Sequence, residues 1–294
     1  MMRVLITGSQ GQVGHCLVEQ LIGMKQVTML ACDRHQLDIT DRSAVLSKVS
    51  EFKPTVIINA AAYTAVDKAE SDRDRAHAVN QKGAQYLAEA AEQQGAALLH
   101  ISTDYVFAGD KEDAYHEQDC PGPQSVYGAS KLAGEQAIQA ACSKHIIIRT
   151  AWVFGEHGGN FVKTMLRLAS QRDALSIVDD QVGGPTYAGD IAKALVHIAQ
   201  CIEAGNDVAY GVYHFAGEPH VSWCEFASTI FTRAHEQGVL EVTPKVTPIS
   251  TAEYPTPAKR PANSRLKTSK IMAHFSIPAS DWQHALGNLI RDQD

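Results

Sequence analysis

Short apolar runs alternate with amphipathic stretches through the first half of the chain. Five runs of five to nine mostly aliphatic residues occupy positions 3–7, 27–32, 54–62, 96–102 and 145–150. Runs of this length between turn residues are typical of strands that are buried on both faces of a parallel sheet. Between the runs, apolar residues recur three or four positions apart, as on one face of a helix. This alternation predicts an α/β fold with a doubly wound parallel sheet of the Rossmann type.

Capping residues mark the start of two predicted helices. Asp41 ends a polar loop and precedes a helix through Val45 and Val49. Ser222 and Glu225 have the spacing of a capping box, which predicts a helix that continues to about position 237. Further helices are predicted over 74–94, 126–135, 160–170 and 188–202, and further strands over 174–178 and 212–216.

The last third of the chain is less regular than the first half. Its segment 254–266 is rich in proline and also carries Lys259, Arg260 and Arg265, so it is neither a helix nor an interior strand. A long loop of this kind is a candidate functional surface. The pattern predicts a nucleotide-binding domain and a smaller, mostly C-terminal domain, interleaved along the chain. We assign 1–155 and 174–217 to the first, and 156–173 and 218–294 to the second.

The composition narrows the class of protein. The chain has 45% hydrophobic and 20% charged residues and a net charge of −7, so it lacks the cationic excess that a nucleic-acid partner requires. No apolar run approaches the length of a membrane-spanning helix, so we expect no membrane partner and a cytoplasmic protein. The six cysteines lie far apart without metal-ligand spacing, which indicates reduced thiols and no metal site.

Three evenly spaced glycines follow the first apolar run. Gly8, Gly11 and Gly14 lie between the predicted strand and a stretch that places Leu17 and Leu21 on one helical face. In such a strand–turn–helix, backbone amides and the positive end of the helix dipole bind a pyrophosphate, and glycine allows the close approach. A turn that only reverses the chain is the alternative, but the flanking strand and helix favour a dinucleotide site.

Asp33 follows the second predicted strand, 19 residues beyond Gly14. An acid here can accept hydrogen bonds from the adenosine ribose hydroxyls, whereas the neighbouring Arg34 suits a 2′-phosphate. A solvated turn is the structural alternative for this pair. Because both residues are present, the choice between NADH and NADPH stays open. Alanines at 60–62 keep the end of the third strand free of bulky side chains, as a flat ligand lying there would require.

Tyr127 and Lys131 are four positions apart on a predicted helix and therefore share one face. A neighbouring ammonium lowers the pKa of a tyrosine from about 10 toward the range in which proton transfer is efficient. Thr103, after the fourth strand, is placed to hydrogen-bond the carbonyl oxygen that Tyr127 would protonate. Each residue alone has a structural alternative, as a helix-surface pair or a turn cap. The three together predict catalysis.

In these motifs the chain resembles the extended short-chain dehydrogenases/reductases, and several longer stretches narrow the resemblance. These stretches are 59–70, 102–107, 149–153, 160–161 and 254–266. Across essentially the whole chain, they are similar to the dTDP-4-dehydrorhamnose reductase family. The stretches 59–70 and 254–266 are the most specific.

The resemblance implies hydride transfer from NADPH or NADH to the C4 ketone of dTDP-4-dehydro-L-rhamnose, giving dTDP-L-rhamnose. It also implies that the smaller domain binds the sugar nucleotide. Tyr127 would donate the proton, Lys131 would lower the pKa of Tyr127 and hold the nicotinamide ribose, and Thr103 would orient the ketone.

The resemblance also implies further contact residues. Asp104 and Trp152 match family positions at the sugar, although a tryptophan after a strand is often simply core. Arg260 is our own candidate for a diphosphate clamp, because a guanidinium suits a bidentate anion. Together with the glycine turn and Arg34, the expected cofactor contacts are Gly8, Gly11, Gln12, Val13, Gly14, Asp33, Arg34, Asp38, Ile39, Ala62, Tyr63, Thr64, Tyr127 and Lys131.

Some members of the family form dimers bridged by a magnesium ion that glutamates hold. The two such positions that we can place fall on His15 and near Gly189, which supply no carboxylate, although Asp190 lies next door. We therefore predict no structural metal and leave a homodimer open.

Two rival functions fit the same motifs. A nucleotide-sugar epimerase or dehydratase uses the same tyrosine and lysine with a tightly held NAD. A dehydratase, however, typically carries Asp-Glu after the threonine, where this chain has Asp104 and Tyr105. The regulatory β subunit of methionine adenosyltransferase has the same fold and binds NADP as a non-catalytic partner. The intact Thr103, Tyr127 and Lys131 argue against this second rival.

Overall fold

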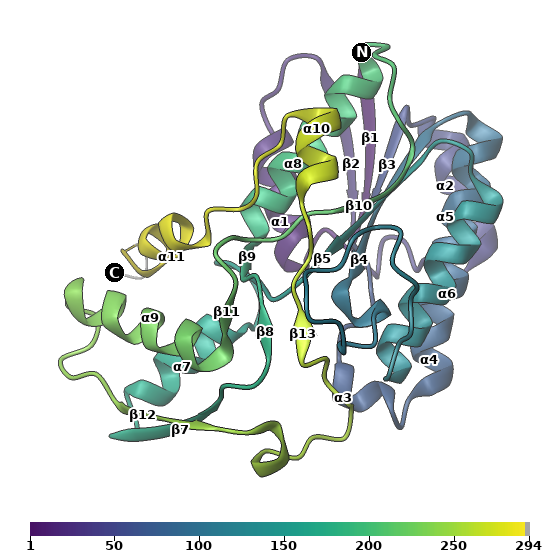
Figure 1. Ribbon diagram of the computed structural model, residues 1–294. Helices are drawn as coiled ribbons and strands as arrows, with labels where there is room; N and C mark the ends of the chain where they lie inside the picture. Colours follow the sequence, from purple (N-terminus) through teal and green to yellow (C-terminus); the bar gives the residue numbers. More distant parts are fainter. Residues whose placement is uncertain (292–294) are drawn as a thin grey trace.

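A six-stranded parallel sheet forms the centre of the larger part of the molecule (Figure 1). The structure, a computed structural model, describes residues 1–291. The strand order is β10-β5-β4-β3-β1-β2, and every neighbouring pair is parallel. The strands are β1 (Met2–Thr7), β2 (Val27–Cys32), β3 (Val56–Asn59), β4 (Ala97–Thr103), β5 (His145–Thr150) and β10 (Gly211–His214). The predicted doubly wound α/β fold is confirmed.

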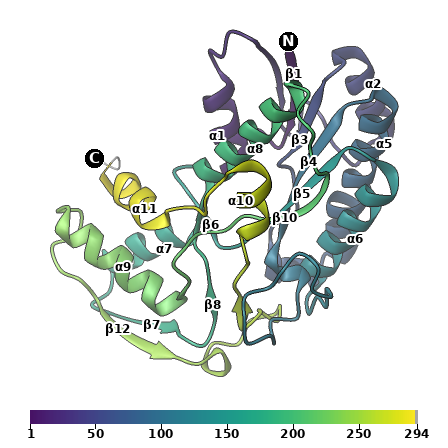
Figure 2. The ribbon, with the colours of Figure 1, turned by 45° about the horizontal axis from the view of Figure 1, so that its top comes forward.

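Helices cover both faces of the sheet because successive strand side chains point to opposite sides. In β1, Val4 and Ile6 pack toward one face and Leu5 packs toward the other. The first face carries α1 (Gln12–Leu21), α8 (Ala188–Glu203) and α10 (Ser269–Phe275). The second face carries α2 (Arg42–Phe52), α5 (Ala84–Gln94) and α6 (Val126–Ala141). Both layers are visible in Figures 1 and 2.

A second hydrophobic core lies beside the sheet, in the part of the molecule that contains α9 in Figure 2. Its helices are α7 (Phe161–Ala169), α9 (Trp223–Glu236) and α11 (Trp282–Arg291). The parallel pair β7 (Ala174–Val178) and β12 (Lys245–Ile249) packs with them, and Leu175 and Ile177 enter this core. The strand at 174–178 therefore lies outside the large sheet, although the sequence division grouped it with the nucleotide-binding part.

Helix ends follow the capping chemistry expected from the sequence. The Asp41 carboxylate accepts a hydrogen bond from the Ala44 amide at the start of α2. At α9, the Ser222 hydroxyl accepts from the Glu225 amide and the Glu225 carboxylate accepts from the Ser222 amide, so the capping box is confirmed.

Two predicted elements differ in detail. The third strand covers Val56–Asn59 and not 54–62, so the alanines after it form a loop at the sheet edge. The helix predicted over 74–94 consists of α4 (Arg73–His77), the π-helical turn η1 (Ala78–Gly83) and α5. A Cβ at Gly134 of α6 would lie 2.1 Å from the carbonyl oxygen of Asn80, so the π turn packs directly against the α6 backbone.

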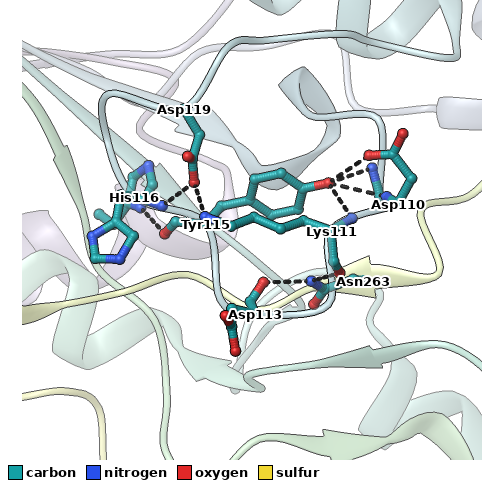
Figure 3. Close-up of polar contacts among 9 residues, drawn as sticks. Asp110, Lys111, Asp113, Tyr115, His116, Asp119 and Asn263 are labelled. Carbon is teal, nitrogen blue, oxygen red and sulfur yellow. Dashed lines mark hydrogen bonds and ion pairs between the residues drawn. The ribbon is translucent and has the colours of Figure 1, made fainter.

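The proline-rich segment 254–266 meets the end of β4, where Ser264 bonds to Asp104, and is held by the loop that follows Phe107 (Figure 3). The Tyr115 hydroxyl accepts hydrogen bonds from the backbone amides of that loop at 109–111. The Asn263 side chain donates to the carbonyl oxygens of Lys111 (2.7 Å) and Asp113 (2.8 Å). These contacts fix a segment whose regular structure is limited to the two-residue strand β13 (Asn263–Ser264).

Short elements complete the fold. They are β6 (Val153–Phe154), β8 (Val182–Gly183), β9 (Thr186–Tyr187), β11 (Val221–Ser222), β13 (Asn263–Ser264), α3 (Val66–Ala69), η2 (Asp104–Val106) and η3 (Thr251–Glu253). Among residues 1–291, no helix is long and apolar enough to cross a membrane.

Candidate active site

The glycine turn joins β1 to α1. In the sheet, β1 lies between β2 on one side and β3 on the other, so the strand order reverses at β1. Gly8 has a φ of 74°, and a Cβ there would lie 2.6 Å from the Ala61 amide nitrogen. A Cβ at Gly14 would lie 2.1 Å from the Gly8 carbonyl oxygen. Two of the three glycines are thus needed for close packing of the turn against β3 and α1. The crevice at such a switch point is where open α/β sheets bind ligands.

A cavity of about 420 Å³ opens beside this turn. Its walls come from the glycine turn, the loop after β2, the loop after β3 and the helices α3 and α4. The expected cofactor residues that line it are Gly8, Gly11, Asp33, Arg34, Asp38, Ile39, Ala62 and Tyr63. Lys68 and Arg75 also line it, and sequence reasoning missed both. With Arg34, they give the cavity three cationic side chains, which suit an anionic dinucleotide.

The remaining expected cofactor residues at the turn do not line this cavity. Val13 is buried against α8 and the sheet, and Gly14 provides the close packing described above. The Gln12 side chain accepts a hydrogen bond from the Asn160 amide at 3.2 Å, toward the second core. Thr64 is exposed.

A larger cavity of about 510 Å³ lies between α8 and α11 and is lined by none of the catalytic candidates.

Asp33 and Asp38, the two acids that line the cofactor cavity, also order the loop after β2. Asp33 Oδ1 accepts from the amides of His35 (2.8 Å) and Gln36 (2.9 Å). Asp38 accepts from both the amide and the hydroxyl of Thr40, and these hydrogen bonds lower the pKa of Asp38 below its usual value. Each carboxylate is therefore held in place beside the cavity.

Buried Asn80, in the π turn, holds the loop after β3. Its side chain accepts from the Tyr63 amide at 2.8 Å and donates to the Tyr63 carbonyl oxygen at 3.1 Å and to the Ser130 hydroxyl at 3.0 Å. Tyr63 and Tyr127 pack against the same small apolar cluster. A π turn inside a helix is frequent at functional sites, but no sequence signal announced this one.

Thr103 and Tyr127 come together where β4 ends against the first turn of α6. The Thr103 hydroxyl donates to Asp104 at 3.0 Å and accepts from the Tyr105 amide at 3.2 Å. Burial raises the pKa of Tyr127 above its usual range, and hydrogen bonding with Thr103 acts in the opposite direction. The Tyr105 ring meets the Tyr127 ring edge-on at 5.4 Å between centroids.

Lys131 is buried one helical turn beyond Tyr127. Its Nζ donates to the Ile101 carbonyl oxygen at 2.6 Å and lies 3.1 Å from Nε2 of His100. Burial lowers the pKa of Lys131 from 10.5 to about 8. The Lys131 amine is engaged by Ile101 and His100, and the hydrogen bond with Thr103 is the interaction that lowers the Tyr127 pKa in this arrangement.

Asp104 is buried beside Thr103, and its second oxygen accepts from the Ser264 hydroxyl of the proline-rich segment. Burial raises the pKa of Asp104 to about 6, and the hydrogen bonds from Ser264 and Thr103 partly offset that rise. Ser264 is a site residue that sequence reasoning missed, because its partner lies 160 positions away.

Trp152 follows β5 with a φ of 50°, a conformation that non-glycine residues rarely adopt. Its ring stacks on Trp223 with centroids 3.5 Å apart. Its other neighbour is Gly183, where a Cβ would lie 2.6 Å from the Trp152 ring. A residue held this way between two parts of the fold is typical of a functional site.

The guanidinium of Arg260 is already engaged. It donates to Asp67 at 2.7 Å and to the Tyr105 hydroxyl at 3.1 Å. Asp67 Oδ1 in turn accepts from the Ala258 amide at 3.2 Å, so α3 holds the proline-rich segment against the site. The side chain of Arg260 is 26% exposed and thus still reaches solvent at the site entrance.

Comparison with known proteins decides the family. The model of the RmlD substrate binding domain family matches residues 2–294. The chain belongs to this family. A dTDP-4-dehydrorhamnose reductase of Aggregatibacter actinomycetemcomitans is 54% identical over 98% of each chain, and that of Escherichia coli K12 is 39% identical over 99% of this chain and 98% of the relative.

Solved structures of the RmlD family agree closely with the fold. The dTDP-4-dehydrorhamnose reductase of Clostridium acetobutylicum superposes with a TM-score of 0.90, at 40% identity over 99% of both chains. The reductase of Bacillus anthracis, solved in complex with NADP, also gives 0.90, at 38% identity over 99% of this chain and 100% of the other. A UDP-glucose 4-epimerase of Thermus thermophilus, at 23% identity and a TM-score of 0.77, shares the fold.

The magnesium-binding positions expected from the resemblance carry no suitable ligands in this RmlD family member. His15 stacks on His157 with ring centroids 4.3 Å apart, and the Gly189 carbonyl accepts from the Gln20 amide. Asp190 accepts from Ser280 at 2.6 Å. These residues do not fit a glutamate-held magnesium. Ligand-type atoms of Cys16, Glu19 and His157 do lie within 4.8 Å of one another, so the absence of a metal stays a prediction.

Proposed function

We propose that the protein reduces the C4 ketone of dTDP-4-dehydro-L-rhamnose to dTDP-L-rhamnose with NADPH or NADH. The observation that carries the proposal is the grouping of Thr103, Tyr127 and Lys131 at the carboxyl end of β4, beside the cavity that Arg34, Lys68 and Arg75 line. Membership of the RmlD family and the names of its relatives supply the substrate.

Each catalytic residue has a separate role in the proposed reaction. A reduced nicotinamide supplies the hydride when it is bound. Tyr127 donates its phenolic proton to the oxygen that gains charge as the ketone is reduced. Thr103, within hydrogen-bonding reach of Tyr127, orients that oxygen by turning to it the hydroxyl proton that it donates to Asp104 in the free protein. Lys131 holds the nicotinamide ribose and, when charged, stabilises the phenolate that remains.

The sugar nucleotide is proposed to bind between the two cores. Asp104 and Trp152 would contact the sugar, and Arg260 would bind the diphosphate while Asp67 and Tyr105 orient its guanidinium.

The two cores also support the predicted division into nucleotide-binding and substrate domains. The strand at 174–178 is moved to the substrate domain because it pairs with β12. A homodimer and a cytoplasmic location stay predictions.

Three cations in the cofactor cavity favour NADPH as the preferred reductant. Arg34, Lys68 and Arg75 line the wall that also contains Asp33, and a 2′-phosphate adds two negative charges that these side chains can neutralise. The relative from Bacillus anthracis was solved with NADP, which agrees with this assignment.

A redox assay separates the proposal from its rivals. The purified protein is mixed with dTDP-4-dehydro-L-rhamnose and NADPH, and both nicotinamide oxidation and sugar product are followed. A reductase oxidises one NADPH for each dTDP-L-rhamnose formed. An epimerase or dehydratase converts a nucleotide sugar with no net oxidation, and a regulatory subunit converts none. The absence of NADPH oxidation would overturn the proposal.

A further inference from the structure

A chain of buried hydrogen bonds runs beneath the active site from β1 to α6. Thr7 Oγ1 is 2.7 Å from Asn59 Oδ1, Asn59 Nδ2 is 2.9 Å from His100 Nδ1, and His100 Nε2 is 3.1 Å from Lys131 Nζ. Thr7, Asn59 and His100 are each 1% exposed and Lys131 is 2% exposed, so these groups bond to one another. The proposed reaction gives no role to Asn59 or His100.

The direction of the hydrogen bond at Asn59 is fixed by its backbone neighbour. The Ala61 amide lies 3.0 Å from Asn59 Oδ1, and an amide N–H can only donate. The atom that faces Ala61 must therefore be the amide oxygen, and the Thr7 hydroxyl donates to the same oxygen. The Asn59 nitrogen, which can only donate, then faces His100 Nδ1. Nδ1 is consequently an acceptor and carries no proton.

The proton of His100 must then lie on Nε2. Burial and the neighbouring Lys131 hold the pKa of His100 well below 6.5, so its ring is neutral and carries a single proton. With Nδ1 accepting, Nε2–H points at Lys131 Nζ. An ammonium has no lone pair to accept this proton, whereas a neutral amine has one. The neutral amine can also donate to the Ile101 carbonyl oxygen, so it satisfies both contacts.

The charges around Lys131 set the pH range of this arrangement. Burial lowers the pKa of Lys131 to about 8 and the carboxylate of Glu135, on the same helix, acts in the opposite direction, so the neutral amine predominates above that pH and the ammonium predominates below it. That carboxylate is itself bonded to the Arg149 guanidinium at 2.7 Å and to the Ser102 hydroxyl at 2.5 Å. Tyr127, on the same face of α6, is neutral because burial raises its pKa.

We propose that Asn59 and His100 are positioning residues that hold the neutral amine form of Lys131 against the Ile101 carbonyl oxygen. When Lys131 takes up a proton, it has to leave Nε2 of His100, because two N–H groups would otherwise face each other. Its charged end is then available to Tyr127 and the cofactor ribose. The catalytic consequence rests on the proposed reductase function, but the protonation states do not.

The tautomer of His100 tests the first step without any substrate. ¹⁵N NMR of the histidine-labelled protein distinguishes the two neutral tautomers and the imidazolium, and His100→Gln identifies the resonance. The expected result is the Nε2–H tautomer between pH 6 and 8. An Nδ1–H tautomer or an imidazolium in that interval would overturn the proposal.

Asn59→Asp tests the link to Lys131. Aspartate has the shape of asparagine and still accepts from Thr7 and Ala61, but its second oxygen is an acceptor. His100 is then expected to carry its proton on Nδ1 and to accept at Nε2 from a charged Lys131. ¹³C NMR of ε-labelled lysine should show the Lys131 titration moving up by about one pH unit or more. If the tautomer switches while the Lys131 titration stays in place, His100 does not control Lys131.

Thr7→Val is the matched control, because Ala61 still fixes the Asn59 amide in that variant. It should change neither the tautomer nor the Lys131 titration, and a shift as large as that of Asn59→Asp would contradict the proposal.

In the active enzyme, Asn59→Asp should move the alkaline limb of the pH profile of kcat/KM to higher pH, together with the Lys131 titration. If the wild-type protein shows no reductase activity, the proposed function fails, while the NMR measurements still decide the positioning role.

Discussion

Ser264 donates a hydrogen bond to the buried carboxylate of Asp104, although 160 positions separate the two residues. The contact places the proline-rich segment directly on the end of β4, beside Thr103. Asn263, the preceding residue, is bound to the loop after Phe107 at two carbonyl oxygens. The segment is therefore part of the candidate active site, and its irregular path follows from contacts distant in sequence.

Asp104 should make the stability of the protein depend on pH. Its pKa is about 6 in the folded protein, above the value of 3.8 expected when unfolded, so the folded state binds the proton more tightly. Its contribution is fully present below pH 3.8 and is lost as the pH rises through 6. Asp104→Asn should remove this slope, so that the free energy of unfolding of the wild type, relative to the variant, falls by about 3 kcal/mol at most between pH 4 and 7.

Urea unfolding of both proteins across that interval measures the slope. Asp207→Asn, at an exposed loop position, is the control and should leave the pH dependence unchanged. Parallel stability curves for Asp104→Asn and the wild type would show that folding does not raise the pKa of Asp104.

Gly183→Ala should disturb the sugar site through Trp152. The added Cβ would lie 2.6 Å from the Trp152 ring, which cannot retreat because Trp223 is stacked on its other side. We expect KM for the sugar nucleotide to rise about tenfold, roughly 1.4 kcal/mol, with Kd for NADPH unchanged. Gly159→Ala, where a Cβ meets nothing within 4 Å, is the control. An unchanged KM in Gly183→Ala would remove Trp152 from the sugar site.

Arg34→Ala should weaken NADPH binding more than NADH binding. A charge-assisted hydrogen bond to the 2′-phosphate contributes about 1.5–3 kcal/mol, so we expect a ten- to hundredfold loss for NADPH only. Isothermal titration with both cofactors measures the difference. Arg42, whose guanidinium pairs with Glu89 and does not line the cavity, supplies the control Arg42→Ala. Equal losses for NADPH and NADH would show that Arg34 does not contact the 2′-phosphate.

Glu135→Gln should destabilise the protein strongly. Glu135 is fully buried and its carboxylate is the ionic partner of Arg149 at 2.7 Å. Removing it leaves a buried guanidinium without its counter-charge, which costs about 3–5 kcal/mol. Urea unfolding should show this loss, whereas Glu89→Gln, which breaks the more exposed pair with Arg42, should cost about 1 kcal/mol or less. Equal losses in the two variants would contradict the inferred burial of the ion pair.

The parallel sheet was predictable because its signals are local. Val27–Cys32 is a strand with the predicted bounds, and Ser222 and Glu225 form the predicted capping box. The short strands β6, β8, β9, β11 and β13 were missed, since two residues carry no periodicity and each strand is defined only by a distant partner. The strand at 174–178 was predicted, but its partner β12 was not, so its packing in the second core was not predicted.

Site residues that belong to one contiguous motif could be predicted from the sequence. Site residues that the fold brings in from distant segments could not. Tyr127 and Lys131 share a helical face, and the glycine turn precedes a helix, so both could be recognised from spacing. Lys68, Arg75 and Asn80 enter the site from helices after β3, and Ser264 comes from the proline-rich segment. Nothing in their local sequence distinguishes them from surface or capping residues.

Single-turnover reduction by Tyr127→Phe tests the central claim most directly. The substitution removes the phenolic proton and keeps the ring that packs beside Tyr63 and Tyr105. With saturating NADPH and dTDP-4-dehydro-L-rhamnose, we expect the rate of reduction to fall about 10²- to 10⁴-fold because a general acid is lost, while Kd for NADPH stays within a few-fold of wild type. A rate close to that of the wild type would contradict the assignment of Tyr127 as the proton donor.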